Sequence, residues 1–185
     1  MNKIKICKTR FKDLFVIKRS FYEDKRGIFS RLFSSELKNY FGLDTSNTQI
    51  NFSLTKTIGT IRGMHFQNKP FAEKKIVTCI SGKVFDVVID LRKDSKTFLQ
   101  YYSKNLSSCN LESIIIPKGF AHGFQVLEKN SMLIYFHSMP HKLDYEEGIH
   151  PMDSKINIEW PISKYKLSKK DKNFKFLRDF SGILV

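Results

Sequence analysis

The sequence predicts a protein built almost entirely of β-strands, closed into a barrel or jelly roll. Short apolar or alternating segments recur roughly every 8–12 residues, which is typical of β-sandwiches and barrels. Turn-forming residues separate these segments, and Ser81-Gly82 is expected to join two strands as a hairpin. Helical periodicity is weak except in residues 36–41 and after Ser168, so we expect only short helices towards the ends of the chain.

The predicted strands cover most of the chain between residues 14 and 138. In order, they are Leu14–Ser20, Gly27–Phe33, Gln49–Thr55, Thr60–Phe66, Lys75–Ile80, Val84–Asp90, Leu99–Leu106, Leu111–Ile116, His122–Leu127 and Met132–Ser138. Between the second and third strands, the segment ELKNYF at residues 36–41 is expected to form a short helix. A serine precedes it as a cap, and Gly42 ends it.

The segment Gln49–Thr55 alternates between polar and apolar residues, so its two faces differ. Ile50, Phe52 and Leu54 share one face. The opposite face is polar but carries no charged residue, whereas a face that is simply exposed to water would be expected to carry some. We therefore expect that face to line a wet cavity; its residues are Gln49, Asn51, Ser53 and Thr55.

Length and composition narrow the class of protein. The chain has 185 residues and a mass of 21.7 kDa, which favours one domain over residues 1–185. Apolar residues make up 41% and charged residues 27%, which excludes collagen-like and wholly disordered chains. No stretch approaches the ~20 apolar residues of a membrane-spanning helix, and no secretory signal is visible. Cys7, Cys79 and Cys109 lack paired spacing, so we expect free thiols in a cytoplasmic protein.

The formal net charge of +14 suggests either an anionic partner or a lysine-rich solvated surface. Part of the charge is local, because seven basic residues fall between Lys164 and Arg178. A nucleic-acid binder is one alternative for such a charge. The chain carries no recognisable nucleic-acid motif, and its basic tail has no interleaved aromatic pattern, so we expect no nucleic-acid partner.

Two glycine-punctuated segments place a histidine on a predicted strand, RGMHFQ with His65 and PKGFAHGF with His122. The spacings G-x5-H and P-x-G-x2-H match the two halves of the metal-binding cupin pattern. The middle of that pattern fails, because Gln67 stands where its second histidine belongs. Two histidines alone make a poor metal site. We therefore predict a cupin-type barrel without metal, in which both imidazoles are free for acid–base chemistry.

Taken together, longer stretches resemble the nucleoside-diphosphate 4-keto-6-deoxyhexose 3,5-epimerase family from about Leu14 to Asp171. The matching stretches are DKRGIF (24–29), QINFS (49–53), IRGMHFQ (61–67), KKIVTCISGKVFDVVIDLRKDS (74–95), IPKGFAHGF (116–124), Tyr135, and IEWP to LSKKD (158–171). The resemblance implies an all-β, cupin-type jelly roll and an isomerase without metal or redox cofactor. It also implies a homodimer with N-terminal strands exchanged or packed across the interface, and a place in deoxysugar synthesis for surface polysaccharides such as O-antigen.

The resemblance also assigns roles to residues. A C4 ketone acidifies the hydrogens on C3 and C5, so a base can form an enolate and an acid on the opposite face can reprotonate it. By similarity, His65 is the base, Asp171 orients it, Tyr135 is the acid, and Lys75 lies near the enolate oxygen. The further substrate-binding positions implied are Arg62, His122, Gln49, Asn51, Arg26 and Phe21.

Two departures from the family pattern leave the substrate and the reaction open. The family motif DxRGxFxE ends in glutamate near the base, whereas this chain has Arg31. An arginine donor suits cytosine, so a CDP-linked substrate stands beside a dTDP-linked one. Pro140-His141 replaces a frequent tyrosine pair, which leaves C3-only epimerisation open. A 3,4-ketoisomerase on the same scaffold and a noncatalytic sugar-binding barrel also stay open.

Overall fold

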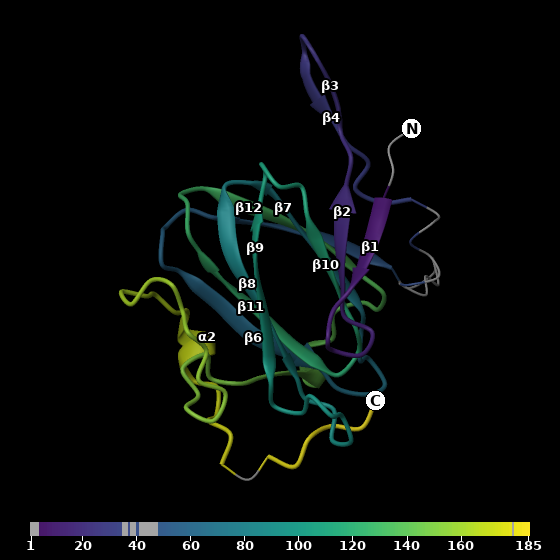
Figure 1. The fold of residues 1–185 in the computed structure, drawn as a ribbon. Coiled ribbons are helices and arrows are strands. Elements are labelled where there is room, and N and C mark those ends of the chain that lie inside the picture. Colours follow the sequence, from purple (N-terminus) through teal and green to yellow (C-terminus); the bar gives the residue numbers. More distant parts are fainter. Residues whose placement is uncertain (1–3, 35–36, 38–39, 41–47, 179) are drawn as a thin grey trace.

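Two antiparallel sheets face each other in the computed structural model, which describes residues 4–34, 37, 40, 48–178 and 180–185. The first sheet has the order β1 (Ile4–Lys8), β2 (Phe15–Arg19), β10 (Ser113–Ile116), β7 (Lys75–Ser81), β12 (Ser131–His137) and β5 (Gln49–Thr55). The second has the order β13 (Glu146–Gly148), β6 (Ile61–Gln67), β11 (Phe120–Val126), β8 (Lys83–Asp90) and β9 (Tyr101–Ser107). This is the predicted jelly-roll class (Figure 1).

The core fills the space between the two sheets. Val77, Cys79 and Leu133 from the first sheet meet Val88 and Phe124 from the second, and all five are buried. The strand β11 runs through the middle of its sheet, and all of its residues are buried. Buried apolar area of this kind supplies most of the stability of a β-sandwich.

A small hairpin of β3 (Tyr22–Asp24) and β4 (Gly27–Phe29) stands away from both sheets (Figure 1). The structure corrects the predicted strand Gly27–Phe33, because the strand ends at Phe29. Beyond it, the backbone carbonyls of Arg31 and Leu32 accept hydrogen bonds from the buried Arg19 guanidinium instead of pairing with a strand.

The turn at Ser81-Gly82 links β7 to β8, but these strands are not paired as a hairpin. The strand β7 pairs with β10 and β12, whereas β8 pairs with β11 and β9. The turn therefore carries the chain from one sheet to the other. The Ser131 hydroxyl holds it by accepting from the Lys83 backbone N–H at 3.1 Å, and Gly82 has a φ of +70°.

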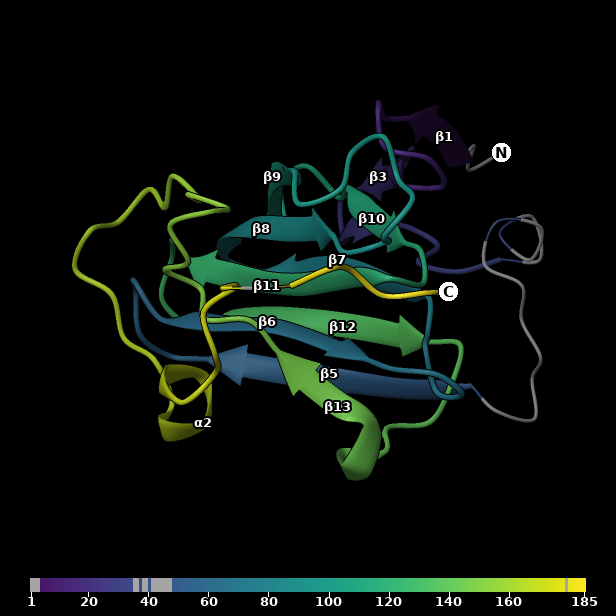
Figure 2. The same cartoon turned by 90° about the horizontal axis from the view of Figure 1, so that it is seen from below.

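Helix is scarce, as predicted. In the described part of the chain, α2 (Lys169–Lys172) is a single short α-helix, and a 3-10 turn, η2, covers Leu143–Tyr145. Figure 2 shows α2 beside the edge of the sheet that carries β6 and β13. The predicted helix at 36–41 falls mostly outside the described residues. No helix among the residues that the structure describes is long and apolar enough to cross a membrane.

One carboxylate fixes the loop after β8. Asp90 has a fully buried side chain that accepts from Arg92 Nε and Nη2 at 2.8 and 2.7 Å and from the hydroxyls of Ser95 and Thr97 at 2.6 Å. Burial alone would raise the pKa of Asp90, but these donors together lower it.

We predict that Asp90→Asn lowers the free energy of unfolding by about 3 kcal/mol at pH 7, because the Arg92 charge loses its buried partner. A lowered folded pKa adds stability above the unfolded pKa and loses it as the pH falls through the folded value. The difference from the wild type should therefore shrink in acid. Urea unfolding across pH measures this, with the exposed Asp94→Asn as control. Equal stability of Asp90→Asn and wild type at pH 7 would contradict the account.

Candidate active site

A cavity of about 270 Å³ lies between the two sheets, where polar side chains replace the apolar core. Strands of both sheets line it, so a ligand there would have protein on two opposite sides. The lining residues are Asn51, Phe52, Ser53, Arg62, His65, Phe66, Gln67, Glu73, Lys75, His122, Phe124, Tyr135, His137, His141 and Glu146.

Strand pairing brings the two predicted histidines together. His65 on β6 is directly opposite His122 on β11. The register shifts just beyond His122, at Gly123, where the two strands approach closely. A Cβ at Gly63 would lie 2.5 Å from the Gly123 Cα, so glycine is required for this approach. Gly63 and Gly123, which lie near His65 and His122 in the two motifs, therefore allow β6 and β11 to approach each other.

His65 is held by Asp171, as the resemblance implies. The distance from His65 Nε2 to Asp171 Oδ1 is 2.7 Å, and the Asp171 side chain is 4% exposed. Ser168 caps α2 by accepting from the Asp171 backbone N–H at 3.0 Å, which fixes the carboxylate's approach. A carboxylate accepts hydrogen bonds, so Nε2 carries the proton and Nδ1 is the basic nitrogen of the neutral ring.

His122 has a carboxylate partner of its own. Its Nε2 lies 2.8 Å from Asp86 Oδ2, and both side chains are buried. Burial raises the pKa of Asp86, and the neighbouring His122 opposes that shift. The other carboxylate oxygen of Asp86 has no hydrogen-bond partner among the described residues. Both residues belong to the second sheet, and His122 lines the cavity whereas Asp86 does not.

Tyr135 enters the cavity from the opposite sheet. Its hydroxyl lies 3.0 Å from the Ser53 hydroxyl on the neighbouring strand β5, and its ring packs edge-on against His122 at 6.3 Å. Burial raises the pKa of Tyr135 far above its usual range, although the Ser53 hydrogen bond works against the shift. The phenol is therefore protonated at neutral pH and can donate a proton.

Lys75 forms part of a trio of side chains joined through Glu73. Its Nζ lies 3.0 Å from Glu73 Oε1, and His137 Nδ1 lies 2.6 Å from Glu73 Oε2. Burial would raise the pKa of Glu73, but Lys75 and His137 together lower it. Glu73 is thus ionised and holds both side chains at the cavity wall.

The predicted polar face of β5 joins this trio through hydrogen bonds. The Gln49 amide donates to Asn51 Oδ1 at 3.0 Å, and the Asn51 amide lies 3.4 Å from His137 Nε2. The backbone N–H of His141 donates to Gln49 Oε1 at 3.0 Å. The expectation that the polar face of Gln49–Thr55 lines a cavity is confirmed for Asn51 and Ser53, whereas Gln49 and Thr55 are not among the lining residues.

The structure brings together most of the predicted site residues, but not those of the hairpin region. The residues that line the cavity or bond to its lining are His65, Asp171, Tyr135, Lys75, Arg62, His122, Asn51 and Gln49. Arg26 instead forms a 2.6 Å ion pair with Asp24 on the hairpin, with its side chain 89% exposed. Phe21 and Arg31 are also exposed and do not line this cavity.

Sequence reasoning missed Glu73, His137 and Glu146 as site residues. Strand parity would have found His137, because it lies two residues beyond Tyr135 on the same predicted strand. Glu73 precedes the strand that begins at Lys75, so parity does not reach it. Glu146 lies on β13, a strand too short to show a pattern. At the departure Pro140-His141, the His141 ring lies in the cavity wall, 2.9 Å from Glu146 Oε2.

Comparisons with known proteins agree with this geometry. The family model described as dTDP-4-dehydrorhamnose 3,5-epimerase matches residues 8–179. The chain is 38% identical over 169 residues to the dTDP-4-dehydrorhamnose 3,5-epimerase of Shigella flexneri, covering 91% of this chain and 93% of that protein. It is 35% identical over 183 residues to the enzyme of that name from Methanothermobacter thermautotrophicus, covering 97% of each.

Solved structures give the same result. An epimerase from Legionella pneumophila in complex with dTDP-4-keto-L-rhamnose has a TM-score of 0.88 and 34% identity, over 94% of this chain and 93% of that one. A dTDP-4-dehydrorhamnose 3,5-epimerase from Bacillus anthracis with TDP and pyrophosphate bound has a TM-score of 0.89 and 34% identity, over 95% and 100%. The chain therefore belongs to the dTDP-4-dehydrorhamnose 3,5-epimerase family, whose members are isomerases of sugar nucleotides.

Proposed function

We propose that this cavity inverts C3 and C5 of a dTDP-linked 4-keto-6-deoxyhexose, with His65 as base and Tyr135 as acid. One observation carries the assignment of roles. The His65–Asp171 pair is anchored to one sheet and the Tyr135 hydroxyl to the other, on two sides of a single cavity. Inversion of a carbon needs proton removal on one face and proton delivery on the other.

The proton balance follows from these side chains. His65 Nδ1 takes the hydrogen from a carbon next to the C4 ketone, and the electron pair moves to O4 as an enolate. The Asp171 carboxylate supports the imidazolium that forms. Tyr135 then delivers a proton to the opposite face of that carbon. Exchange with solvent restores the proton of Tyr135 and removes the one held by His65.

Lys75 is the cation for the enolate oxygen. Preorganised positive charge in a site that excludes water stabilises a developing oxyanion by about 3 kcal/mol for one donor. The ion pair with Glu73 holds the ammonium at the cavity wall before the substrate arrives. Arg62, the guanidinium of the lining, donates to the Thr55 hydroxyl at 3.3 Å, and its further donors support a role in binding substrate oxygens.

A homodimer completes the site in this proposal. The edge strand β5 exposes Ile50, Phe52 and Leu54, at 61%, 72% and 43%, and Phe52 also contributes to the cavity lining. The β3–β4 hairpin exposes further apolar residues, namely Tyr22, Ile28 and Phe29. Exposed apolar surface of this kind, present both on β5 and on the hairpin, typically marks an interface between chains. A second copy that covers it would bring Phe21, Arg26 and Arg31 of the hairpin region to the partner's cavity.

We further place the protein in the cytoplasm, in deoxysugar synthesis. Cys7, Cys79 and Cys109 are all free thiols, and Cys109 is exposed, which suits a reducing compartment. Sugar nucleotides are the activated donors for surface polysaccharides, so the product would feed that synthesis.

The test of the proposed function is deuterium incorporation. We expect the wild-type protein in D2O to place deuterium at both C3 and C5 of dTDP-4-keto-6-deoxyglucose, and to do so more slowly with the CDP-linked sugar. Proton NMR of the products measures both positions. Label at C3 alone would indicate a C3 epimerase, faster labelling of the CDP sugar would assign Arg31 to cytosine, and no label with either sugar would refute the proposal.

Tyr135→Phe tests the acid role separately, because it removes only the hydroxyl. His65 can still take up a proton, exchange it with D2O and return deuterium to the same face. We therefore expect label without inversion, with the inverted product reduced about a hundredfold. Undiminished inversion by Tyr135→Phe would remove that residue from the acid role.

The dimer predicts complementation between two inactive variants. His65→Ala removes the base from its own cavity. Phe21→Ala/Arg26→Ala removes hairpin side chains that would serve the partner's cavity. Mixing the two chains should restore about a quarter of wild-type activity, since half of the dimers are mixed and each holds one intact site. Activity after unfolding and refolding the mixture measures this. A monomer in sedimentation, or no recovery from the mixture, would contradict the shared site.

A further inference from the structure

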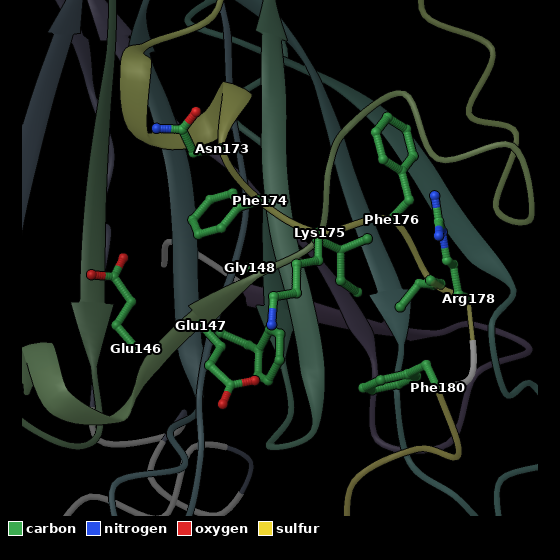
Figure 3. Close-up of a pocket in the computed structure, with 12 residues that line it drawn as sticks. Glu146, Glu147, Gly148, Asn173, Phe174, Lys175, Phe176, Arg178 and Phe180 are labelled. Carbon is green, nitrogen blue, oxygen red and sulfur yellow. The ribbon is translucent and has the colours of Figure 1, made fainter.

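The segment from α2 to Lys175 is held against the edge of the second sheet by contacts on both sides of Phe174. Before it, Asp171 bonds to His65, and Lys170 Nζ lies 2.5 Å from Glu146 Oε2. After it, the Lys175 carbonyl accepts from the His150 backbone N–H at 3.1 Å. The backbone around Phe174 therefore has little freedom, and its ring must lie over β13 (Figure 3).

The Phe174 ring packs directly on the His65 imidazole. The two ring centres are 5.4 Å apart, and the planes meet at 69°. An edge-to-face contact of this kind is favourable beyond the apolar area it buries. His65 is thus contacted by two side chains of the same segment, by Asp171 through a hydrogen bond and by Phe174 through its ring.

Gly148 makes room for this ring. On β13, Gly148 is directly opposite His65 of β6. A Cβ at Gly148 would overlap the Cδ2, Cε2 and Cζ atoms of Phe174. Figure 3 shows the ring beside the strand at this glycine. On the β13 side, the residue opposite His65 thus has no side chain, and the Phe174 ring occupies that space.

The ring also separates His65 from a second, larger cavity. This cavity, of about 900 Å³, is lined by Phe174, Phe66 and Glu146 among others, but not by His65. Removing the phenyl ring would open a path for water to the His65 Nε2–Asp171 hydrogen bond. Water competes for both partners, and a wetter environment weakens the electrostatic support from the carboxylate.

We propose that Phe174 is a positioning residue for His65, and that Gly148 is required because it admits the Phe174 ring. The inference rests on the proposed function, since it assigns His65 to proton transfer. Asp171 determines which nitrogen of His65 carries the proton. Phe174 adds a steric requirement, because it fixes the plane of the imidazole and excludes water from the His65–Asp171 hydrogen bond.

The proposal predicts a defined pattern of variants. Phe174→Ala should lower kcat about tenfold to a hundredfold, as expected for a displaced catalytic group, with KM changed less than about threefold. Phe174→Leu should recover part of the loss. Gly148→Ala should be similarly harmful, but Gly148→Ala/Phe174→Ala should be no worse than Phe174→Ala, because the clash is gone. Phe176→Ala is the control, since its ring stacks on His150 and not on His65.

Nitrogen-15 shifts of the His65 ring supply a readout independent of turnover. The wild type should show a single Nε2–H tautomer, and Phe174→Ala a mixture of the two. A single tautomer and wild-type kcat in Phe174→Ala would overturn the proposal, as would additive losses in the double variant. If the wild type moves no deuterium, the proposed function fails, and the ring shifts still decide whether Phe174 holds His65.

Discussion

The hydrogen bond between His65 and the buried Asp171 carboxylate is the interaction on which the rest of the site depends. A carboxylate that is 4% exposed must be paired, because an isolated buried charge is costly. Its partner lies 106 residues earlier in the chain, so the pairing ties the C-terminal segment to β6. The same tie brings Lys170 to Glu146 and Phe174 to His65. One hydrogen bond between distant parts of the chain thereby holds this segment beside the cavity.

The jelly roll supplies the second constraint, because it surrounds the cavity with strands from two facing sheets. Its strands alternate between sheets, as at the turn after Ser81, so residues distant in the chain face each other across a narrow gap. His65 projects from one wall, and Tyr135 and Lys75 project from the other. An epimerase needs this arrangement, because the two protons move on opposite faces of the sugar ring.

Much of the fold and part of the site could be predicted from the sequence. Alternation in residues 49–55 predicts both the strand β5 and its cavity-facing side, since strand parity is a local property. Short strands such as β1, β3 and β13 escape prediction, because three to five residues show no clear period. Asp171 is identifiable only through family resemblance, since nothing local distinguishes a carboxylate in a lysine-rich segment. Glu73 lies before β7, and its contact with His137 follows only from the sheet register, which places His137 opposite Lys75.

The hairpin residues mark another limit of sequence reasoning. The resemblance places Phe21, Arg26 and Arg31 near the substrate, yet in one chain they lie away from the cavity. A resemblance in sequence indicates which residues a site would use, but not whether one chain or two would supply them. The exposed apolar faces of β5 and the hairpin are the physical reason to expect a second copy.

The variant Asp171→Asn isolates the proposed role of Asp171, because it keeps the side-chain shape and replaces the charged carboxylate beside His65 with a neutral amide. The measurement is the initial rate of deuterium incorporation at C3 and C5 in D2O. We expect a fall of about a hundredfold or more at both carbons, while the exposed Asp144→Asn keeps the wild-type rate. A folded Asp171→Asn protein that incorporates deuterium at the wild-type rate would contradict that role.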